Sequence, residues 1–209
     1  MGLGKGDRIL VHARNSNIML EVMFATFRVG AVFVPTNFRL LPDEVIYLAE
    51  MSGAVLFICD DAFPDHARII AETVPGVRHL LTIGGDGAGT VEGLIAANEG
   101  ATAPAEPVLY DDPCWFFFTS GTTGRSKASV LTHGQMAFIV TNHLADLMPG
   151  TSEGDASLVV APLSHGAGVH ALSQVARGAV SILPEGERFD VAETWRLVAE
   201  WRVSNAFTV

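Results

Sequence analysis

The sequence predicts an α/β fold in which layered, mostly parallel sheets are flanked by helices. Short apolar runs typical of buried strands alternate along the chain with longer segments of helical periodicity. The chain has 209 residues, of which 49% are hydrophobic and 17% are charged. This composition can bury a sizeable core and is too apolar for a disordered chain. Alternation of this kind is typical of strand–helix units that pair into parallel sheets.

The first half of the chain supplies the clearest strand–helix alternation. Pro42 suits the first turn of a helix, and Asp43 and Glu44 suit its positive end. Val45, Leu48 and Met51 are predicted to form the inner face of that helix, and Gly53 to end it. The predicted strands are residues 8–11, 31–34, 55–58 and 77–83, and the predicted helices are residues 18–29 and 42–52.

The second half continues the pattern after a surface crossing at residues 98–107, which is rich in Ala, Pro and Glu. We therefore expect one α/β subdomain over residues 1–107 and a second over residues 108–209. The inner face of the last helix is predicted from Val191, Trp195, Val198 and Trp201. The predicted strands are residues 114–118, 128–131, 158–161, 180–183 and 205–209, and the predicted helices are residues 133–147, one after Gly168, and 191–201.

Charge and cysteine content exclude several classes of protein. The formal net charge of −10 argues against a nucleic-acid-binding surface, so an anionic substrate would need a local positive pocket. Cys59 and Cys114 lie in apolar runs and are predicted to be buried thiols, not a disulfide or a metal site. No secretory signal or bilayer-spanning run is apparent, so the cytoplasm is the expected location.

One loop combines the chemistry needed to hold phosphate groups. It follows the apolar strand at 114–118 and contains two glycines, two cations and the hydroxyl side chains of Thr119, Ser120, Thr122 and Thr123. Glycines allow successive backbone N–H groups to converge on an anion, and hydroxyls and cations add further donors. Such a loop can stabilise the charge that develops on departing pyrophosphate. The residues expected to bind phosphate are Thr119, Ser120, Gly121, Thr122, Thr123, Gly124 and Lys127, with Arg125 adding positive charge.

The glycine-rich segments match neither of two common nucleotide-binding motifs. The loop is not a Walker A motif, because two residues separate Gly124 from Lys127 and a strand is predicted to follow. The segment 84–89 lacks the spacing of a dinucleotide-binding fingerprint and is predicted to be a plain loop. A Ser/Thr/Gly cluster alone would fit a polar turn between two strands, but the full nine-residue pattern favours phosphate binding.

The loop resembles the phosphate-binding signature of the AMP-forming adenylate ligases, a family that includes acyl-CoA synthetases. Ser126 and Ala128 stand where that signature has proline and glycine, and neither change removes a donor. The resemblance extends to further segments along nearly the whole chain. These are Gly6-Asp7-Arg8-Ile9, Gly30-Ala31-Val32-Phe33-Val34-Pro35, Ala161-Pro162-Leu163-Ser164-His165-Gly166-Ala167-Gly168 and Phe207-Thr208-Val209.

The resemblance implies an ATP-dependent ligase of the acyl-CoA synthetase type, with this chain as part of its large N-terminal domain. A small-molecule carboxylate would form an acyl-adenylate, and coenzyme A would then accept the acyl group, with Mg²⁺ screening the phosphates of ATP. His165 would take a catalytic and substrate-binding place beside the acyl pocket, and Gly168 would border the same pocket. No protein ligand to a metal is assigned, and the resemblance leaves a homodimer open.

Several parts of the family pattern are not found in these 209 residues, including the adenine-binding motif, the hinge and the C-terminal lid domain with its lysine. The chain is therefore expected to be an N-terminal fragment that is inactive alone. Two alternatives stay open. One is a non-catalytic nucleotide-binding module, and the other is an adenylation domain that loads a carrier protein.

Overall fold

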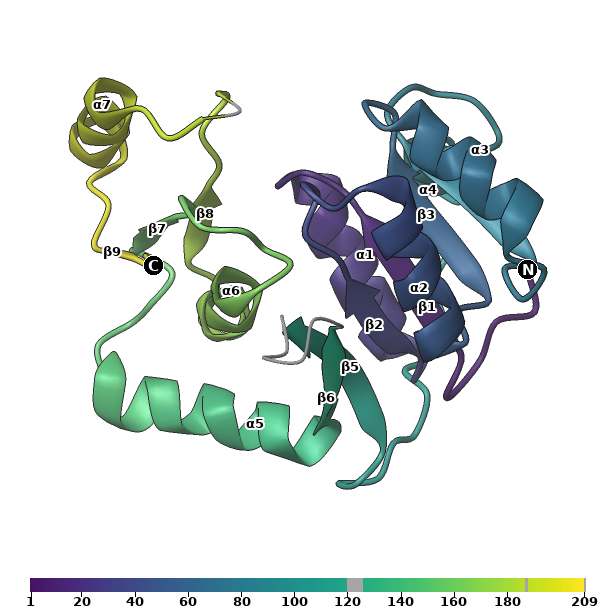
Figure 1. Ribbon diagram of the computed structural model, residues 1–209. Coiled ribbons are helices and arrows are strands. Elements are labelled where there is room, and N and C mark those ends of the chain that lie inside the picture. The colour runs from purple at the N-terminus through teal and green to yellow at the C-terminus, as the bar shows by residue number, and fades with distance from the viewer. Residues whose placement is uncertain (120–125, 187, 209) are drawn as a thin grey trace. The chain divides into compact units, whose positions relative to one another are not determined.

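The computed structural model describes residues 1–119, 126–186 and 188–208 (Figure 1). The chain divides into two compact units, Met1–His133 and Gly134–Val209. The division lies later than the boundary near residue 107 that the sequence suggested. The reason is that the apolar strand before the phosphate-binding loop, and the strand after that loop, pair with the first sheet.

The first unit contains a six-stranded sheet within the described residues, in the order β4-β3-β1-β2-β5-β6. Every neighbouring pair is parallel except β5 and β6, which are antiparallel. The mostly parallel sheet predicted from the sequence is confirmed. The strands are β1 (Arg8–His12), β2 (Val32–Pro35), β3 (Leu56–Asp60), β4 (His79–Ile83), β5 (Pro113–Thr119) and β6 (Lys127–Thr132).

The helices of the first unit are α1 (Asn17–Arg28), α2 (Pro42–Ser52), α3 (Pro64–Thr73) and α4 (Val91–Ala97). The two predicted helices, α1 and α2, are present, and Gly53 ends α2 in the left-handed conformation, with φ of 62°. Met51 is 55% exposed, so its predicted place on the inner face was wrong; Ala49 is buried there instead. The helices α3 and α4 were not predicted from the sequence, because each buries only one apolar side chain, Ile70 and Val91 respectively.

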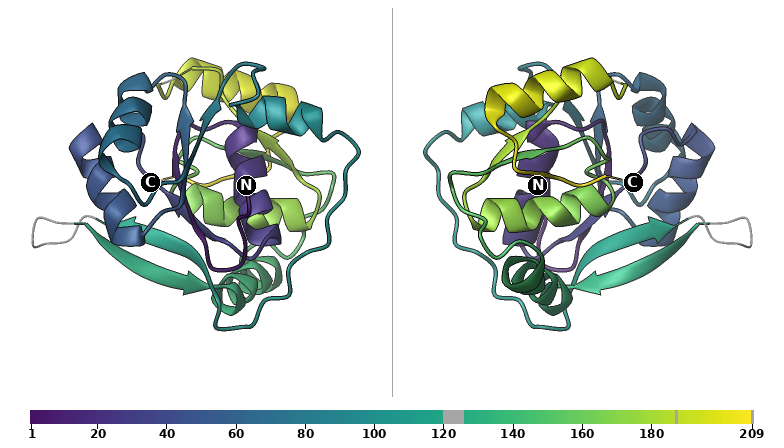
Figure 2. Two further views of the ribbon diagram at one scale, coloured as in Figure 1. Left: turned by 90° about the vertical axis from the view of Figure 1, so that its right-hand side faces the viewer. Right: turned by 90° about the vertical axis from the view of Figure 1, so that its left-hand side faces the viewer.

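Alternation along the strands sends side chains to two cores. Leu10 is opposite Val34 and Phe57 in the register, and these side chains pack with residues of α2 and α3. On the other face, Phe33 lies 5.0 Å from Trp115, measured between ring centroids, and Phe27 of α1 contacts both rings. Figure 2 shows α2 and α3 on one side of this sheet and α1 on the other. The strands β1, β2 and β3 are therefore buried on both faces, as expected for the centre of a parallel sheet.

The second unit is built around a smaller parallel sheet, in the order β8-β7-β9. Its cluster of buried residues comprises Ala156, Leu158, Ile182 and Leu197. The elements are α5 (His133–Asn142), which begins at the unit boundary, the π-helix η1 (His143–Leu147), β7 (Ala156–Leu158), α6 (Gly166–Ala176), β8 (Val180–Ile182), α7 (Val191–Trp201) and β9 (Asn205–Ala206).

The bounds of α7 match the prediction, but its predicted inner face was largely wrong. Within this structure Val191, Trp195 and Trp201 are 59%, 67% and 49% exposed. Leu197 is buried instead, and Val198 packs beside it. The side of the helix that reaches the small sheet is therefore centred on Leu197 and Val198, and Val191 and Trp195 lie outside it.

In the part of the chain that the structure describes, none of the helices combines the length and the apolar character needed to cross a membrane. Cys59 and Cys114 are buried free thiols, as predicted. Burial raises the pKa of both thiols to about 12.

Candidate functional site

The two ends of the predicted phosphate-binding loop meet at the end of the β5–β6 hairpin. Thr119 is the last residue of β5 and lies directly opposite Lys127, the first residue of β6. Residues opposite each other in an antiparallel pair project from the same face of the sheet. The side chains of Thr119 and Lys127 therefore project from the same face of the hairpin, and both residues are exposed. The hairpin can present a hydroxyl donor and a positive charge to one anion.

The other predicted phosphate ligands, Ser120, Gly121, Thr122, Thr123 and Gly124, lie outside the described residues, as does Arg125. The structure gives their attachment points, because Thr119 and Ser126 border the segment. The aromatic residues of β5 hold the first attachment point. Phe116 and Phe118 pack against the α2–α3 core, and Trp115 is fully buried on the opposite face.

A tyrosine of α2 holds the second attachment point. The phenol of Tyr47 donates a hydrogen bond to the backbone carbonyl oxygen of Ser126, at 3.3 Å. Tyr47 was not predicted as a functional residue, because helical periodicity placed it beside the predicted inner face of α2. A tyrosine flanking an apolar stripe is the only signal that could have indicated it, since such a ring can pack while its hydroxyl reaches a polar partner.

In the second unit, His165 and Gly168 lie in one tight turn at the start of α6. His165 is the residue before the helix, and its carbonyl oxygen accepts a hydrogen bond of 2.9 Å from the N–H of Gly168. The His165 residue is exposed, whereas Gly168 is buried. The two residues that the sequence assigned to an acyl pocket are thus neighbours in space, with a histidine side chain exposed at the helix start.

Phe207 closes over this turn. A Cβ atom added to Gly166 would lie 2.3 Å from Cζ of Phe207 and 2.7 Å from Cε1. Because real Cβ contacts do not come so close, only glycine allows the ring to rest against the backbone there. The packing of Phe207, which follows β9, therefore requires glycine at position 166.

A buried polar network lies one turn further along α6. Nε2 of His170 lies 2.9 Å from Oδ1 of Asn205 and 3.3 Å from Oγ of Ser157. Gln174 brings its amide nitrogen within 3.3 Å of the same ring nitrogen. Burial lowers the pKa of His170, an effect that the Asn205 hydrogen bond opposes and nearby His143 reinforces. His170 is therefore neutral near neutral pH.

The carboxyl ends of the central strands of the first sheet carry a second polar cluster. His12 is fully buried at the end of β1, with Nδ1 at 2.7 Å from Oγ1 of Thr36 and its ring stacked on His66 at 4.4 Å. Burial, reinforced by His66, lowers the pKa of His12 to about 4, although Asp60 opposes the shift. Arg14 also donates to both carboxylate oxygens of Asp60 at 3.0 Å. Ligands of open α/β sheets usually bind at this edge, but here side chains fill it.

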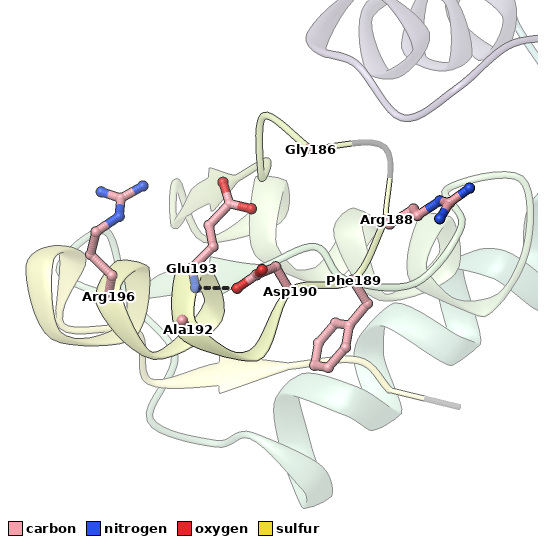
Figure 3. Close-up of a pocket in the computed structure, with 7 residues that line it drawn as sticks. All are labelled: Gly186, Arg188, Phe189, Asp190, Ala192, Glu193 and Arg196. Atoms are coloured by element: carbon pink, nitrogen blue, oxygen red, sulfur yellow. Dashed lines mark hydrogen bonds between the residues drawn. The ribbon is translucent and has the colours of Figure 1, made fainter.

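A surface hollow of about 880 Å³ lies beside the start of α7 (Figure 3). The N–H of Glu193 donates to Oδ1 of Asp190 at 2.8 Å, so the first turn of the helix already has its cap. The side chains of Arg188 and Arg196 point away from each other (Figure 3). The hollow includes no residue predicted for phosphate or acyl binding, and we assign it no role.

The residues that the structure describes include no group of three His, Cys, Asp or Glu side chains that could hold a metal ion.

The comparisons with known proteins decide the family. The family model described as "AMP-binding enzyme" matches residues 1–209. The chain belongs to the AMP-binding enzyme family. This finding confirms the family resemblance drawn from the phosphate-binding signature.

Named relatives in this family are CoA ligases. A feruloyl-CoA synthase of Amycolatopsis sp. is 35% identical over 210 residues, covering all of this chain and 39% of the relative. A crotonobetaine/carnitine–CoA ligase of Escherichia coli (strain SE11) is 27% identical, covering 98% of this chain and 40% of the relative. The chain thus spans about two fifths of the length of these AMP-binding relatives.

Solved structures of the family share the fold. ATP-bound MatB from Rhodopseudomonas palustris is 28% identical with a TM-score of 0.78, over 95% of this chain and 38% of that one. The inhibitor-bound N-terminal domain of FACL13 from Mycobacterium tuberculosis has a TM-score of 0.80 at 25% identity, over 98% of this chain and 50% of that one. The α/β fold predicted from the sequence, as part of an acyl-CoA synthetase N-terminal domain, is confirmed.

Proposed function

We propose that the full-length protein containing this chain is an AMP-forming carboxylate–CoA ligase that works through an acyl-adenylate in the cytoplasm. The first unit would bind the phosphates of ATP through Thr119, Lys127 and the residues between them. The second unit would contribute to the acyl site through His165 and Gly168. The observation that carries the proposal is the pairing of Thr119 with Lys127 across the end of the β5–β6 hairpin.

The first chemical step needs positive charge where negative charge develops. A carboxylate oxygen of the substrate attacks the α-phosphorus of ATP, and the bond from that phosphorus to the bridging oxygen breaks. Pyrophosphate leaves with the electron pair, so charge builds on its oxygens. The ammonium of Lys127 and the hydroxyl of Thr119 project from the same face of the hairpin and would stabilise that charge.

The second step transfers the acyl group. The thiolate of coenzyme A attacks the carbonyl carbon of the acyl-adenylate, and AMP leaves as the carbon–oxygen bond breaks. His165 is the exposed side chain at the start of α6, and it would contact the acyl group or its carboxylate in both steps.

The decisive experiment is an ATP–pyrophosphate exchange assay on the full-length protein with a panel of carboxylic acids. Ferulate and crotonobetaine represent the acids in the names of the relatives, and octanoate represents an unrelated aliphatic acid. Carboxylate-dependent exchange is expected with at least one acid and background exchange with the 209-residue piece alone. ATP binding without exchange under any acid would favour a non-catalytic nucleotide-binding module instead.

The acyl acceptor needs a separate measurement. With the acid that supports exchange, release of AMP is expected to depend on coenzyme A and to yield the acyl-CoA thioester. Thioester formation only on a carrier protein bearing a phosphopantetheine arm would assign the alternative, an adenylation domain that loads such a carrier.

A further inference from the structure

The polar network around His170 connects three elements of the second unit. His170 and Gln174 are on α6, Ser157 is on β7 and Asn205 is on β9. His170 is 9% exposed, and Ser157 and Gln174 are almost fully buried. A buried polar group costs free energy unless it is hydrogen-bonded, so a cluster of this size is expected to fix the relative position of its elements.

The geometry assigns the proton of the imidazole. The shortest contact of Nε2 is to Oδ1 of Asn205, at 2.9 Å, and an amide oxygen can only accept. Nε2 therefore carries the proton and donates a hydrogen bond to Oδ1 of Asn205, so the longer 3.3 Å contact with the Gln174 amide nitrogen, itself a donor, is not a hydrogen bond. The amide nitrogen of Asn205 then donates to Oε1 of Gln174 at 3.3 Å, which continues the same direction of donation.

Asn205 is two residues from Phe207, whose ring rests on the turn that begins at His165. The His170 and Phe207 ring centroids are 6.1 Å apart, so His170 contacts both ends of this short segment. Gly166 leaves no space between its backbone and the Phe207 ring. A shift of the segment after β9 would therefore move the ring and release the first turn of α6.

From these contacts we propose that His170 is a positioning residue for the acyl site. By donating to Asn205 it holds the segment 205–207 against α6, and through Phe207 it fixes the turn that carries His165. This inference rests on the proposed function, because His165 matters only if that turn contacts the acyl group. His170 itself is buried below the turn and does not touch substrate.

The test uses the full-length protein and measures the KM for ATP and the KM for the best acid of the panel above by pyrophosphate exchange. His170→Phe fills the space without a donor, whereas His170→Gln restores an N–H at about the reach of Nε2. Asn205→Ala removes the acceptor from a half-buried position, so this variant provides the same test if His170→Phe does not fold. Thermal unfolding identifies the folded variants.

We expect His170→Phe and Asn205→Ala each to raise the KM for the acid about tenfold. The KM for ATP should stay within about twofold of the wild type in both, because the phosphate-binding residues lie in the other unit. His170→Gln should recover most of the loss. The double variant should be no worse than either single variant, because both remove one interaction.

Three results would overturn the inference while leaving the proposed function intact. They are an unchanged KM for the acid in folded Asn205→Ala, equal rises in both KM values, and a His170→Gln variant as impaired as His170→Phe. Wild-type protein that supports exchange with none of the acids would overturn the proposed function and this inference with it.

Discussion

The phenol of Tyr47, on α2, donates a hydrogen bond of 3.3 Å to the backbone carbonyl oxygen of Ser126. Ser126 immediately precedes Lys127, so a helix on one face of the first sheet holds the residue next to the proposed phosphate ligand. The bond connects two positions 79 residues apart in the chain. It offers a way to disturb the loop without altering any residue proposed to contact ATP.

Tyr47→Phe in the full-length protein should raise the KM for ATP about fivefold, since a neutral hydrogen bond contributes about 1 kcal/mol. The ring keeps its packing against the α2–α3 core, so the thermal midpoint should change little. Tyr110 is the other tyrosine of the chain and is 65% exposed, which makes Tyr110→Phe the matched control. Equal effects of the two substitutions would rule out a specific role for the Tyr47 bond.

Lys127→Ala should lower kcat for pyrophosphate exchange by about 100-fold or more, the usual loss when a donor to a developing oxyanion is removed. Lys5 is the other lysine and pairs with Asp112 at 2.7 Å on the surface. Lys5→Ala should leave kcat unchanged and change stability little, because the ion pair lies on the surface. Normal exchange by Lys127→Ala, above all with Gly121 and Gly124 also enlarged, would refute phosphate binding by this loop.

The buried His12 predicts a dependence of stability on pH. Its pKa is about 4 in the folded protein against 6.5 for a free histidine. Below pH 6.5 the unfolded chain therefore binds a proton that the folded chain does not bind. The contribution of neutral His12 to the free energy of unfolding is therefore complete above pH 6.5. It is lost as the pH falls toward 4, by about 3 kcal/mol at roughly 1.4 kcal/mol per pKa unit.

His12→Asn, which keeps a polar group near Thr36 but cannot be protonated, should show less of this loss. The measurement is the urea midpoint of unfolding at pH 7, 5.5 and 4.5. The urea midpoint of the wild type should exceed that of the variant most at pH 7, and the difference between the two midpoints should decrease as the pH falls. A gap that stays constant would mean that His12 is not kept neutral by burial.

Gly166→Ala should destabilise the protein by about 1–3 kcal/mol, the usual cost of overpacking a well-packed site. The added methyl group would fall 2.3 Å from Phe207, so the ring must move. Gly154→Ala is the control, because the nearest atom there is the Ser152 hydroxyl oxygen at 3.6 Å. A second change, Phe207→Leu, should recover part of the lost thermal midpoint; no recovery would argue against this contact as the cause.

Much of the fold could be predicted because its strongest signals are local. The apolar runs of the parallel strands and the cap at Gly53 are properties of neighbouring residues, and they located β1 to β4 and α2 to within a few positions. The helix α3 carries a single buried side chain, Ile70, so no apolar stripe marked it. The face of α7 was misjudged because two large tryptophans outweighed Leu197, and only the tertiary contacts show which side is buried.

The candidate site likewise has a part that local sequence predicts and a part that depends on distant partners. The chemistry of the phosphate-binding loop could be predicted from its residue types, and the structure adds that Thr119 and Lys127 face each other. Residues 120–125 lie outside the described part, so their contacts stay predictions. Tyr47 and Asn205 could not be identified from the sequence, because each depends on a distant partner that no periodicity connects to it. Ser126 is 79 residues from Tyr47, and His170 is 35 residues from Asn205.

The strand order of the first sheet also describes how the sheet can be assembled during synthesis. Of these six strands, β1 comes earliest in the chain; β2 then pairs on one side of it, and β3 and β4 extend the other side. β5 and β6 complete the edge beyond β2. Each new strand meets an edge that is already exposed, so no finished strand pair has to reopen. These six strands can therefore pair in the order in which they are synthesised, without waiting for the later unit.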